Sequence, residues 1–221
     1  QRQMCIRDRK RKAYQNQTGD IRRGVGMALF SYKTGVWPIS LEIAGARLSL
    51  NQDGSVQLQV GATEIGQGAD TVFSQMAAET LHMDISRVHI VTQQDTDVTP
   101  FDTGAYASRQ SFVTGTAVKE CAQQLKQKIL EYARTLVPGN VDRLELEDGY
   151  ILADGKPAIS LEDLAMESYY SLSNSSVLTA EVSRQVKKNT VASGCCFAEV
   201  EVDMKLGKIK VLDIVNVHDS G

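Results

Sequence analysis

Apolar residues recur along the chain at two spacings, and these spacings predict where strands and helices lie. Segments in which apolar residues alternate with small or polar ones are typical of β-strands. Such segments are residues 24–32, 46–50, 55–60, 87–92, 144–146, 150–152, 198–203 and 208–217, with a weaker alternation over 177–186. Asp53-Gly54 and Asp148-Gly149 each separate two of these segments, so each pair predicts the turn of a hairpin.

Two longer segments repeat their apolar residues every three or four positions, which predicts helices over residues 69–82 and 110–136. The second helix has one apolar face, formed by Val113, Ala117, Cys121, Leu125, Ile129 and Tyr132. A third, short helix over residues 160–168 begins at Ser160, which forms a capping-box-like pair with Asp163. Because strands and long helices are intermixed with several hairpins, we predict the α+β fold class.

The organisation along the chain predicts three parts. Residues 1–23 begin with a polar, basic stretch that lacks an apolar period, so we expect this segment to be disordered or non-native. Residues 24–137 form the first lobe, and a boundary near Pro138 begins a second lobe over residues 138–221. The chain stops directly after a strand-like apolar run, so we expect the second lobe to be truncated.

Composition narrows the classes of function. With 42% hydrophobic and 23% charged residues the chain is typical of a soluble globular protein. A net charge of −3 argues against nucleic acid as a partner, and the lack of an apolar run of membrane-spanning length argues against a membrane. The four cysteines match neither a disulfide framework nor a zinc pattern, so we expect reduced thiols in a cytoplasmic protein.

The first segment that points to chemistry is the glycine-rich loop of residues 61–68, Gly-Ala-Thr-Glu-Ile-Gly-Gln-Gly, between a strand and a helix. Glycines allow a tight turn and close approach to a ligand. The unpaired N–H groups of the helix that follows suit an anion such as phosphate. Gln67, between two glycines, offers an amide to a polar heterocycle. A glycine-rich turn without a ligand explains the same pattern about equally well.

A second loop, residues 102–111, also leads into a predicted helix and is rich in small residues and hydroxyls. Ser108 is the better N-cap candidate, and Ser111 lies one turn on. Tyr106 and Arg109 are equally well explained as packing and salt-bridge residues. Because both loops precede helix N-termini, we expect them to approach each other around one anionic ligand.

The sequence does not support nucleophilic catalysis or a metal held by protein ligands. His82 and His89 are best explained as structural residues. His218 and Asp219 are neighbours on a predicted strand, so their side chains point to opposite faces. The chain has no Gly-x-Ser-x-Gly motif and no metal-binding spacing of His, Cys or carboxylate residues, so we assign no metal ligand.

Both loops resemble known sequences. Residues 61–68, followed by Phe73-Ser74-Gln75-Met76-Ala77-Ala78-Glu79, resemble the pterin-binding loop and helix of the xanthine dehydrogenase and aldehyde oxidase family. Residues 92–110 resemble its second cofactor loop, and residues 197–203 and 216–221 resemble strands that follow. The resemblance covers residues 24–221 and is strongest to the molybdenum-binding subunit of the bacterial three-subunit enzymes.

The resemblance implies a molybdopterin-type molybdenum cofactor, in bacteria often the cytosine dinucleotide form, held by the lobe of residues 24–137. It assigns cofactor contacts to Gly66, Gln67, Gly68, Ala107, Ser108 and Ser111. It also implies FAD-binding and iron–sulfur partner subunits. In the family the dithiolene of the cofactor holds the metal, so the absence of a metal motif is expected.

The activity implied by the resemblance is hydroxylation of a small purine, hypoxanthine or xanthine, to urate, with water as the oxygen source. The base glutamate of the family would lie beyond Gly221, so we assign no catalytic residue here and expect the 221 residues to be inactive alone. Oxidation of an aldehyde, nicotinate or carbon monoxide is the alternative within the family. A non-redox module that binds phosphate or a nucleotide is the alternative from another class.

Overall fold

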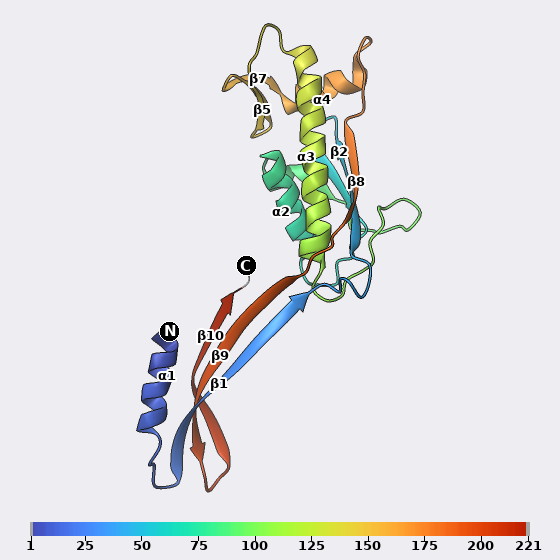
Figure 1. The fold of residues 1–221 in the computed structure, drawn as a ribbon. Helices are drawn as coiled ribbons and strands as arrows, with labels where there is room; N and C mark the ends of the chain where they lie inside the picture. Colours follow the sequence, from blue (N-terminus) through green and yellow to red (C-terminus); the bar gives the residue numbers. More distant parts are fainter. Residues whose placement is uncertain (1, 220–221) are drawn as a thin grey trace. The chain divides into compact units, whose positions relative to one another are not determined.

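The computed structural model describes residues 2–219, and the side chains of residues 5–219. The chain forms two compact units, shown in Figure 1. Unit 1 combines the residues before Gly35 with those after Lys188, and unit 2 is the continuous segment Gly35–Lys188. None of the described helices is both long enough and apolar enough to cross a membrane.

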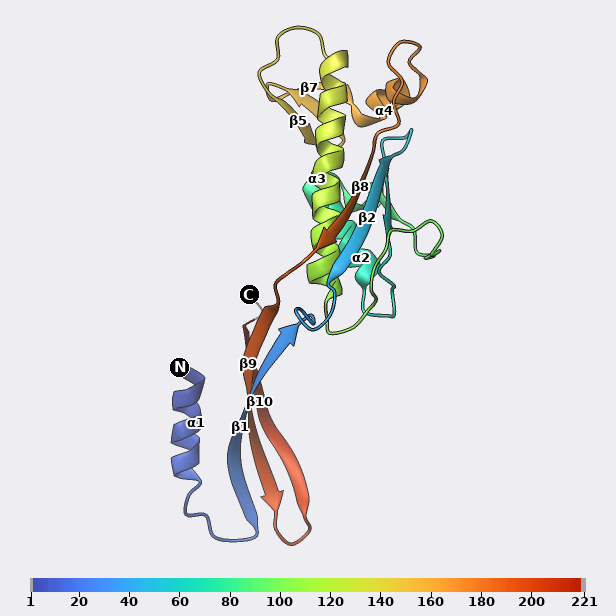
Figure 2. The same cartoon turned by 45° about the vertical axis from the view of Figure 1, so that its right-hand side comes forward.

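Unit 2 is built around a four-stranded sheet in the order β4-β3-β2-β8. The hairpin predicted at Asp53-Gly54 joins β2 (Ile43–Leu50) to β3 (Val56–Val60), which pair antiparallel. The outer strands are β4 (Val88–Ile90), parallel to β3, and β8 (Thr179–Gln185), antiparallel to β2. Figure 2 shows β2 and β8 side by side beside α3.

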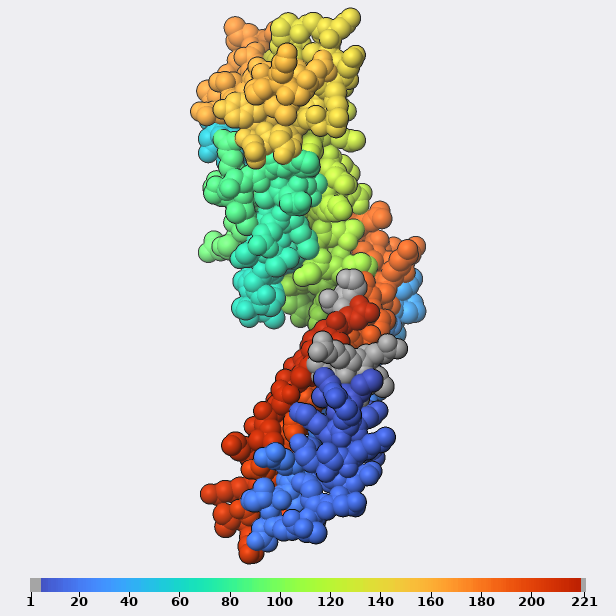
Figure 3. Space-filling view, turned by 90° about the vertical axis from the view of Figure 1, so that its left-hand side faces the viewer, coloured from blue at the N-terminus to red at the C-terminus, as the bar shows by residue number. Residues whose placement is uncertain are grey.

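Two helices bury the apolar side of this sheet. They are α2 (Ala69–Leu81) and α3 (Gln110–Leu136), and both confirm the helical periods in the sequence. All six residues of the predicted apolar face of α3 are buried. A Cβ atom at Gly115 would lie 2.6 Å from the Sδ atom of Met76, so glycine is what lets α3 pack this closely against α2. On the face shown in Figure 3, α2 and α3 lie next to each other.

A small antiparallel sheet completes unit 2. The predicted hairpin at Asp148-Gly149 joins β5 (Leu144–Glu147) to β6 (Tyr150–Ala153), and a strand that the sequence did not predict, β7 (Lys156–Ser160), pairs with β6. Helix α4 (Leu161–Tyr170) follows, and the side chain of Ser160 accepts a hydrogen bond from the N–H of Asp163, as the capping pair predicted. The 3-10 turn η1 (Ile85–Arg87) precedes β4.

Unit 1 is a three-stranded antiparallel sheet in the order β1-β9-β10. Its strands are β1 (Ile21–Thr34), β9 (Thr190–Asp203) and β10 (Lys208–Asp219). Many of its apolar side chains are exposed, for example Leu29 at 74% and Ile209 at 69%. The sheet therefore lacks a core of the kind that unit 2 has.

The α+β fold class is confirmed, while the division of the chain differs from the predicted one. Pro138 is not a unit boundary, because β8 pairs with β2 and keeps the following residues in unit 2. The first strand leaves the predicted first lobe because β1 pairs with β9 over its whole length. Within the segment predicted to be disordered, helix α1 (Arg2–Ala13) forms, since its sequence is rich in good helix formers. Residues 1, 220 and 221 lie outside the described residues.

Candidate functional site

The two loops singled out in the sequence meet in unit 2, as predicted. Between them lies a cavity of about 400 Å³. Its lining comes from the first loop with the start of α2, and from the second loop with the start of α3. The lining residues are Ile65, Gln67, Ala69, Val72, Ala105, Tyr106, Ser108, Arg109, Gln110 and Ser111.

The first loop needs glycine at several positions, each for a different reason. Gly66 and Gly68 have φ angles of 96° and 82°, in the left-handed region, and a Cβ atom at either would meet nothing within 4 Å. The space where their side chains would lie is therefore open. At Gly61 a Cβ atom would lie 2.1 Å from the carbonyl oxygen of Pro100, so this glycine lets the two loops touch.

The N-terminus of α2 is occupied by the protein itself. The Glu64 carboxylate accepts hydrogen bonds from the N–H groups of Gly66 at 2.7 Å, Gly68 at 3.0 Å and Asp70 at 3.1 Å. These bonds lower the pKa of Glu64, with that from Gly68 contributing most. The N–H groups of Gly68 and Asp70 are therefore already paired within the protein, whereas the sequence predicted unpaired donors at this helix start.

Gln67 and Gln110 connect the two walls of the cavity. The Nε2 atom of Gln67 donates to the Oε1 atom of Gln110 at 2.5 Å, and both amides donate to the carbonyl oxygen of Thr63 at 3.1 Å. The Oε1 atom of Gln67 accepts from the N–H of Ile65 at 2.7 Å. An amide oxygen has two lone pairs, and the second has no partner among the described residues. This oxygen can accept a hydrogen bond from a ligand.

The second loop enters α3 through two residues in the left-handed region. Ala107 and Ser108 have φ angles of 49° and 52°, which are uncommon for residues with a Cβ atom. Ser108 is not the N-cap, because α3 begins at Gln110 and the residue directly before the helix is Arg109. That position falls to Arg109, whose side chain makes no capping hydrogen bond.

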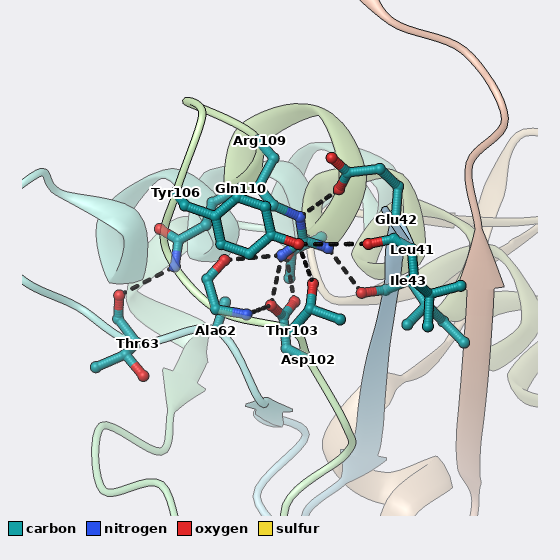
Figure 4. A network of polar contacts seen from close by, with 12 residues as sticks. Leu41, Glu42, Ile43, Ala62, Thr63, Asp102, Thr103, Tyr106, Arg109 and Gln110 are labelled. Carbon is teal, nitrogen blue, oxygen red and sulfur yellow. Dashed lines mark hydrogen bonds and ion pairs between the residues drawn. The ribbon is translucent and has the colours of Figure 1, made fainter. Parts of the chain in front are cut away.

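Arg109 is fully buried and holds the second loop against β2, as Figure 4 shows. Its guanidinium pairs with the buried carboxylates of Glu42 at 2.5 Å and Asp102 at 2.6 Å. It also donates to the carbonyl oxygens of Gly104 at 2.9 Å and Ile43 at 2.7 Å. Burial lowers the pKa of Arg109, but the two carboxylates outweigh burial and raise it overall. The salt-bridge interpretation of Arg109 is confirmed.

The structure places the sequence-predicted residues close together, but only some of them line the cavity. Gln67, Ser108 and Ser111 line the cavity. Gly66 and Gly68 flank Gln67, and Ala107 precedes Ser108, but none of these three is among the lining residues. The sequence patterns did not point to a role for Glu42, Glu64 or Gln110. Glu64 could have been found, because a carboxylate near the N-terminus of a helix is favoured by the helix dipole.

The lining groups favour one kind of ligand. The amides of Gln67 and Gln110 and the hydroxyls of the lining serines suit the edges of a polar heterocycle, and apolar side chains such as Ile65 and Val72 suit its faces. No group of three or more His, Cys, Asp or Glu residues that could hold a metal exists in the part of the chain that the structure describes.

Comparisons with known proteins place the whole chain among molybdenum-enzyme sequences. The family model of the molybdopterin cofactor-binding domain matches residues 2–221. The xanthine dehydrogenase molybdenum-binding subunit of Escherichia coli O157:H7 is 48% identical over 217 residues, which are 97% of this chain and 29% of that protein. The chain thus spans less than a third of the length of this relative.

Two solved structures share the fold. Quinoline 2-oxidoreductase from Pseudomonas putida 86 gives a TM-score of 0.79 at 22% identity, over 100% of this chain and 29% of the other. Reconstituted CO dehydrogenase from Oligotropha carboxidovorans gives a TM-score of 0.81 at 22% identity, over 99% of this chain and 28% of the other.

Proposed function

Because the chain belongs to the molybdopterin cofactor-binding domain family, we propose that it forms part of the cofactor site of a xanthine dehydrogenase. The whole enzyme would hydroxylate hypoxanthine and xanthine to urate, with water as the source of oxygen. The observation that carries this proposal is the cavity between residues 61–68 and 103–111, lined by amides and hydroxyls. The similarity to the E. coli subunit supports the choice of a purine substrate.

The described residues fit a molybdopterin in three ways. The Oε1 atom of Gln67 has a lone pair for a ring N–H group. The open backbone of Gly66 and Gly68 accommodates a flat ring at close range. Ser108 and Ser111 line the same cavity, and the exposed hydroxyl of Ser111 can donate a hydrogen bond. When bound, the cofactor supplies the redox chemistry of the enzyme, and these residues bind and orient it.

The experiment that tests this function uses the full-length protein, purified with any subunits that accompany it. We expect molybdenum and a pterin in the preparation, and oxidation of xanthine with a higher kcat/KM than that for an aldehyde, nicotinate or carbon monoxide. Reaction in ¹⁸O-labelled water should place the label in urate. A preparation without molybdenum or pterin would refute the proposal, whereas a preference for another of these substrates would refute only its purine part.

The proposal extends to the assembly. From the family that the sequence resembles, we infer that the subunit acts with FAD-binding and iron–sulfur subunits in the cytoplasm. The cofactor would be the cytosine dinucleotide form. Copurification of flavin and iron, together with release of CMP on mild acid hydrolysis, would support this extension. The absence of both would contradict it.

A phosphate- or nucleotide-binding module without redox activity is the competing function. The structure provides an argument against it, because the N-terminus of α2 already binds the carboxylate of Glu64. The same preparation distinguishes the two functions, since a simple nucleotide-binding module would contain nucleotide but no molybdenum.

A further inference from the structure

The loop of residues 61–68 contains an arrangement that the proposed function does not explain. The carboxylate of Glu64 accepts hydrogen bonds from three backbone N–H groups, those of Gly66, Gly68 and Asp70. One oxygen, Oε1, accepts from the residue before Gln67 and from the residue after it. The other oxygen, Oε2, accepts from the first turn of α2. Glu64 therefore fixes the backbone on both sides of Gln67.

The charge at this helix start is also unusual. The positive end of a helix dipole favours one anion, and Glu64 supplies it. Asp70 adds a second carboxylate in the first turn, and its Oδ1 atom is buried without a hydrogen-bond partner. Burial, followed by the charge of Glu64, raises the pKa of Asp70. The start of α2 is thus a site where a further anion would be repelled.

We propose that Glu64 is a positioning residue that takes the place of an anionic ligand at the N-terminus of α2 and thereby holds Gln67 toward the cavity. Anionic groups of the cofactor then bind away from α2. The role of Gln67 toward the cofactor rests on the proposed function, whereas the clamp by Glu64 does not depend on it.

The chemistry of a carboxylate is what this position needs. A carboxylate accepts hydrogen bonds at both oxygens and donates none. In a Glu64→Gln variant the amide oxygen can still accept from Gly66 and Gly68, but the NH2 group would face the N–H of Asp70. Glu64→Ala removes all three contacts and leaves the helix start open.

Hydrogen exchange of the 221-residue chain tests the clamp without any cofactor. We expect Glu64→Ala to speed exchange at Gly66, Gly68 and Asp70 by about tenfold or more, as the loss of one hydrogen bond implies. Glu64→Gln should speed it mainly at Asp70. Glu79→Gln, an exposed carboxylate on the same helix, is the matched control and should leave these amides unchanged. Unchanged exchange in Glu64→Ala would overturn the proposal.

A titration of the unaltered chain with inorganic phosphate, followed by NMR, tests the charge argument even if the variants fold poorly. We expect no phosphate-dependent shift at Gly66, Gly68 or Asp70, and a shift at these amides in Glu64→Ala. Phosphate-dependent shifts at these amides in the unaltered chain would overturn the proposal. Lack of molybdopterin in the full-length protein would instead refute the proposed function and leave the clamp intact.

Discussion

Replacement of Arg109 by methionine should destabilise unit 2 by about 3–5 kcal/mol. The magnitude follows from the burial of the network, since the side chains of Arg109, Glu42 and Asp102 are all 0% exposed. Removal of one partner from a buried ion pair leaves an uncompensated charge, which typically costs this much. Arg109→Lys retains the charge but loses the planar guanidinium, so we expect a smaller loss of about 1.5–3 kcal/mol.

Urea unfolding followed by tryptophan fluorescence measures this effect. Trp37 is the only tryptophan in the sequence and is half-buried in unit 2, so its emission reports on the unit that contains Arg109. Arg143→Ala is the matched control, because Arg143 pairs with Glu145 but its side chain is 75% exposed. Exposed pairs contribute about 0–1 kcal/mol, so the control should unfold almost as the original protein does.

The decisive comparison is between the free energies of unfolding of Arg109→Met and Arg143→Ala. If Arg109→Met lowers the free energy of unfolding by no more than Arg143→Ala does, the network around Arg109 does not stabilise unit 2, and the reasoning from burial is wrong. Equal effects of Arg109→Met and Arg109→Lys would instead show that the geometry of the guanidinium, and not its charge, carries the stabilisation.

Three further predictions concern single residues. Gln67→Ala in the full-length protein should weaken cofactor retention by about 5- to 150-fold, as an unpaired polar group implies, and unchanged molybdenum content would contradict this. Gly61→Ala should destabilise unit 2 by about 1–3 kcal/mol, because its Cβ atom would lie 2.1 Å from the carbonyl oxygen of Pro100. Gly26→Ala, where a Cβ atom meets nothing, is the control in urea unfolding, and equal effects would contradict the steric argument. Burial raises the pKa of Cys121 to about 11, so its thiol should stay unlabelled by iodoacetamide at pH 8 in the folded chain. The free energy of unfolding should fall as pH rises from about 9 to 11, because the thiol of the unfolded chain ionises first. Labelling of native Cys121 at the rate of the unfolded chain, read by mass spectrometry, would refute that burial.

Local patterns predicted most elements of the fold. Helix α3 spans the predicted residues because its apolar period, followed by Pro138-Gly139, acts within the segment itself. The two hairpins followed from Asp-Gly turns for the same reason. The division into units could not be predicted in this way. It depends on strand pairs such as β1 with β9, whose residues are far apart in the sequence.

The site shows the same contrast. The two loops were recognisable because their glycines, hydroxyls and Gln67 are contiguous in the sequence. The network around Arg109 was not, because Glu42 lies 67 positions away and its carboxylate reaches Arg109 only after β2 and α3 pack together. The pairing of N–H groups at the start of α2 was not predicted, because an N–H group that is unpaired within a helix can still be satisfied by a preceding side chain such as Glu64.

The contacts of Arg109 bear on the order in which a holoenzyme is assembled. All the groups that accept hydrogen bonds from its guanidinium belong to the protein. The charges of Arg109, Glu42 and Asp102 are consequently balanced within unit 2 and require nothing from a ligand. A receptor of this type can fold before it is filled. Release of the ligand would then return an empty but intact protein that can be reloaded.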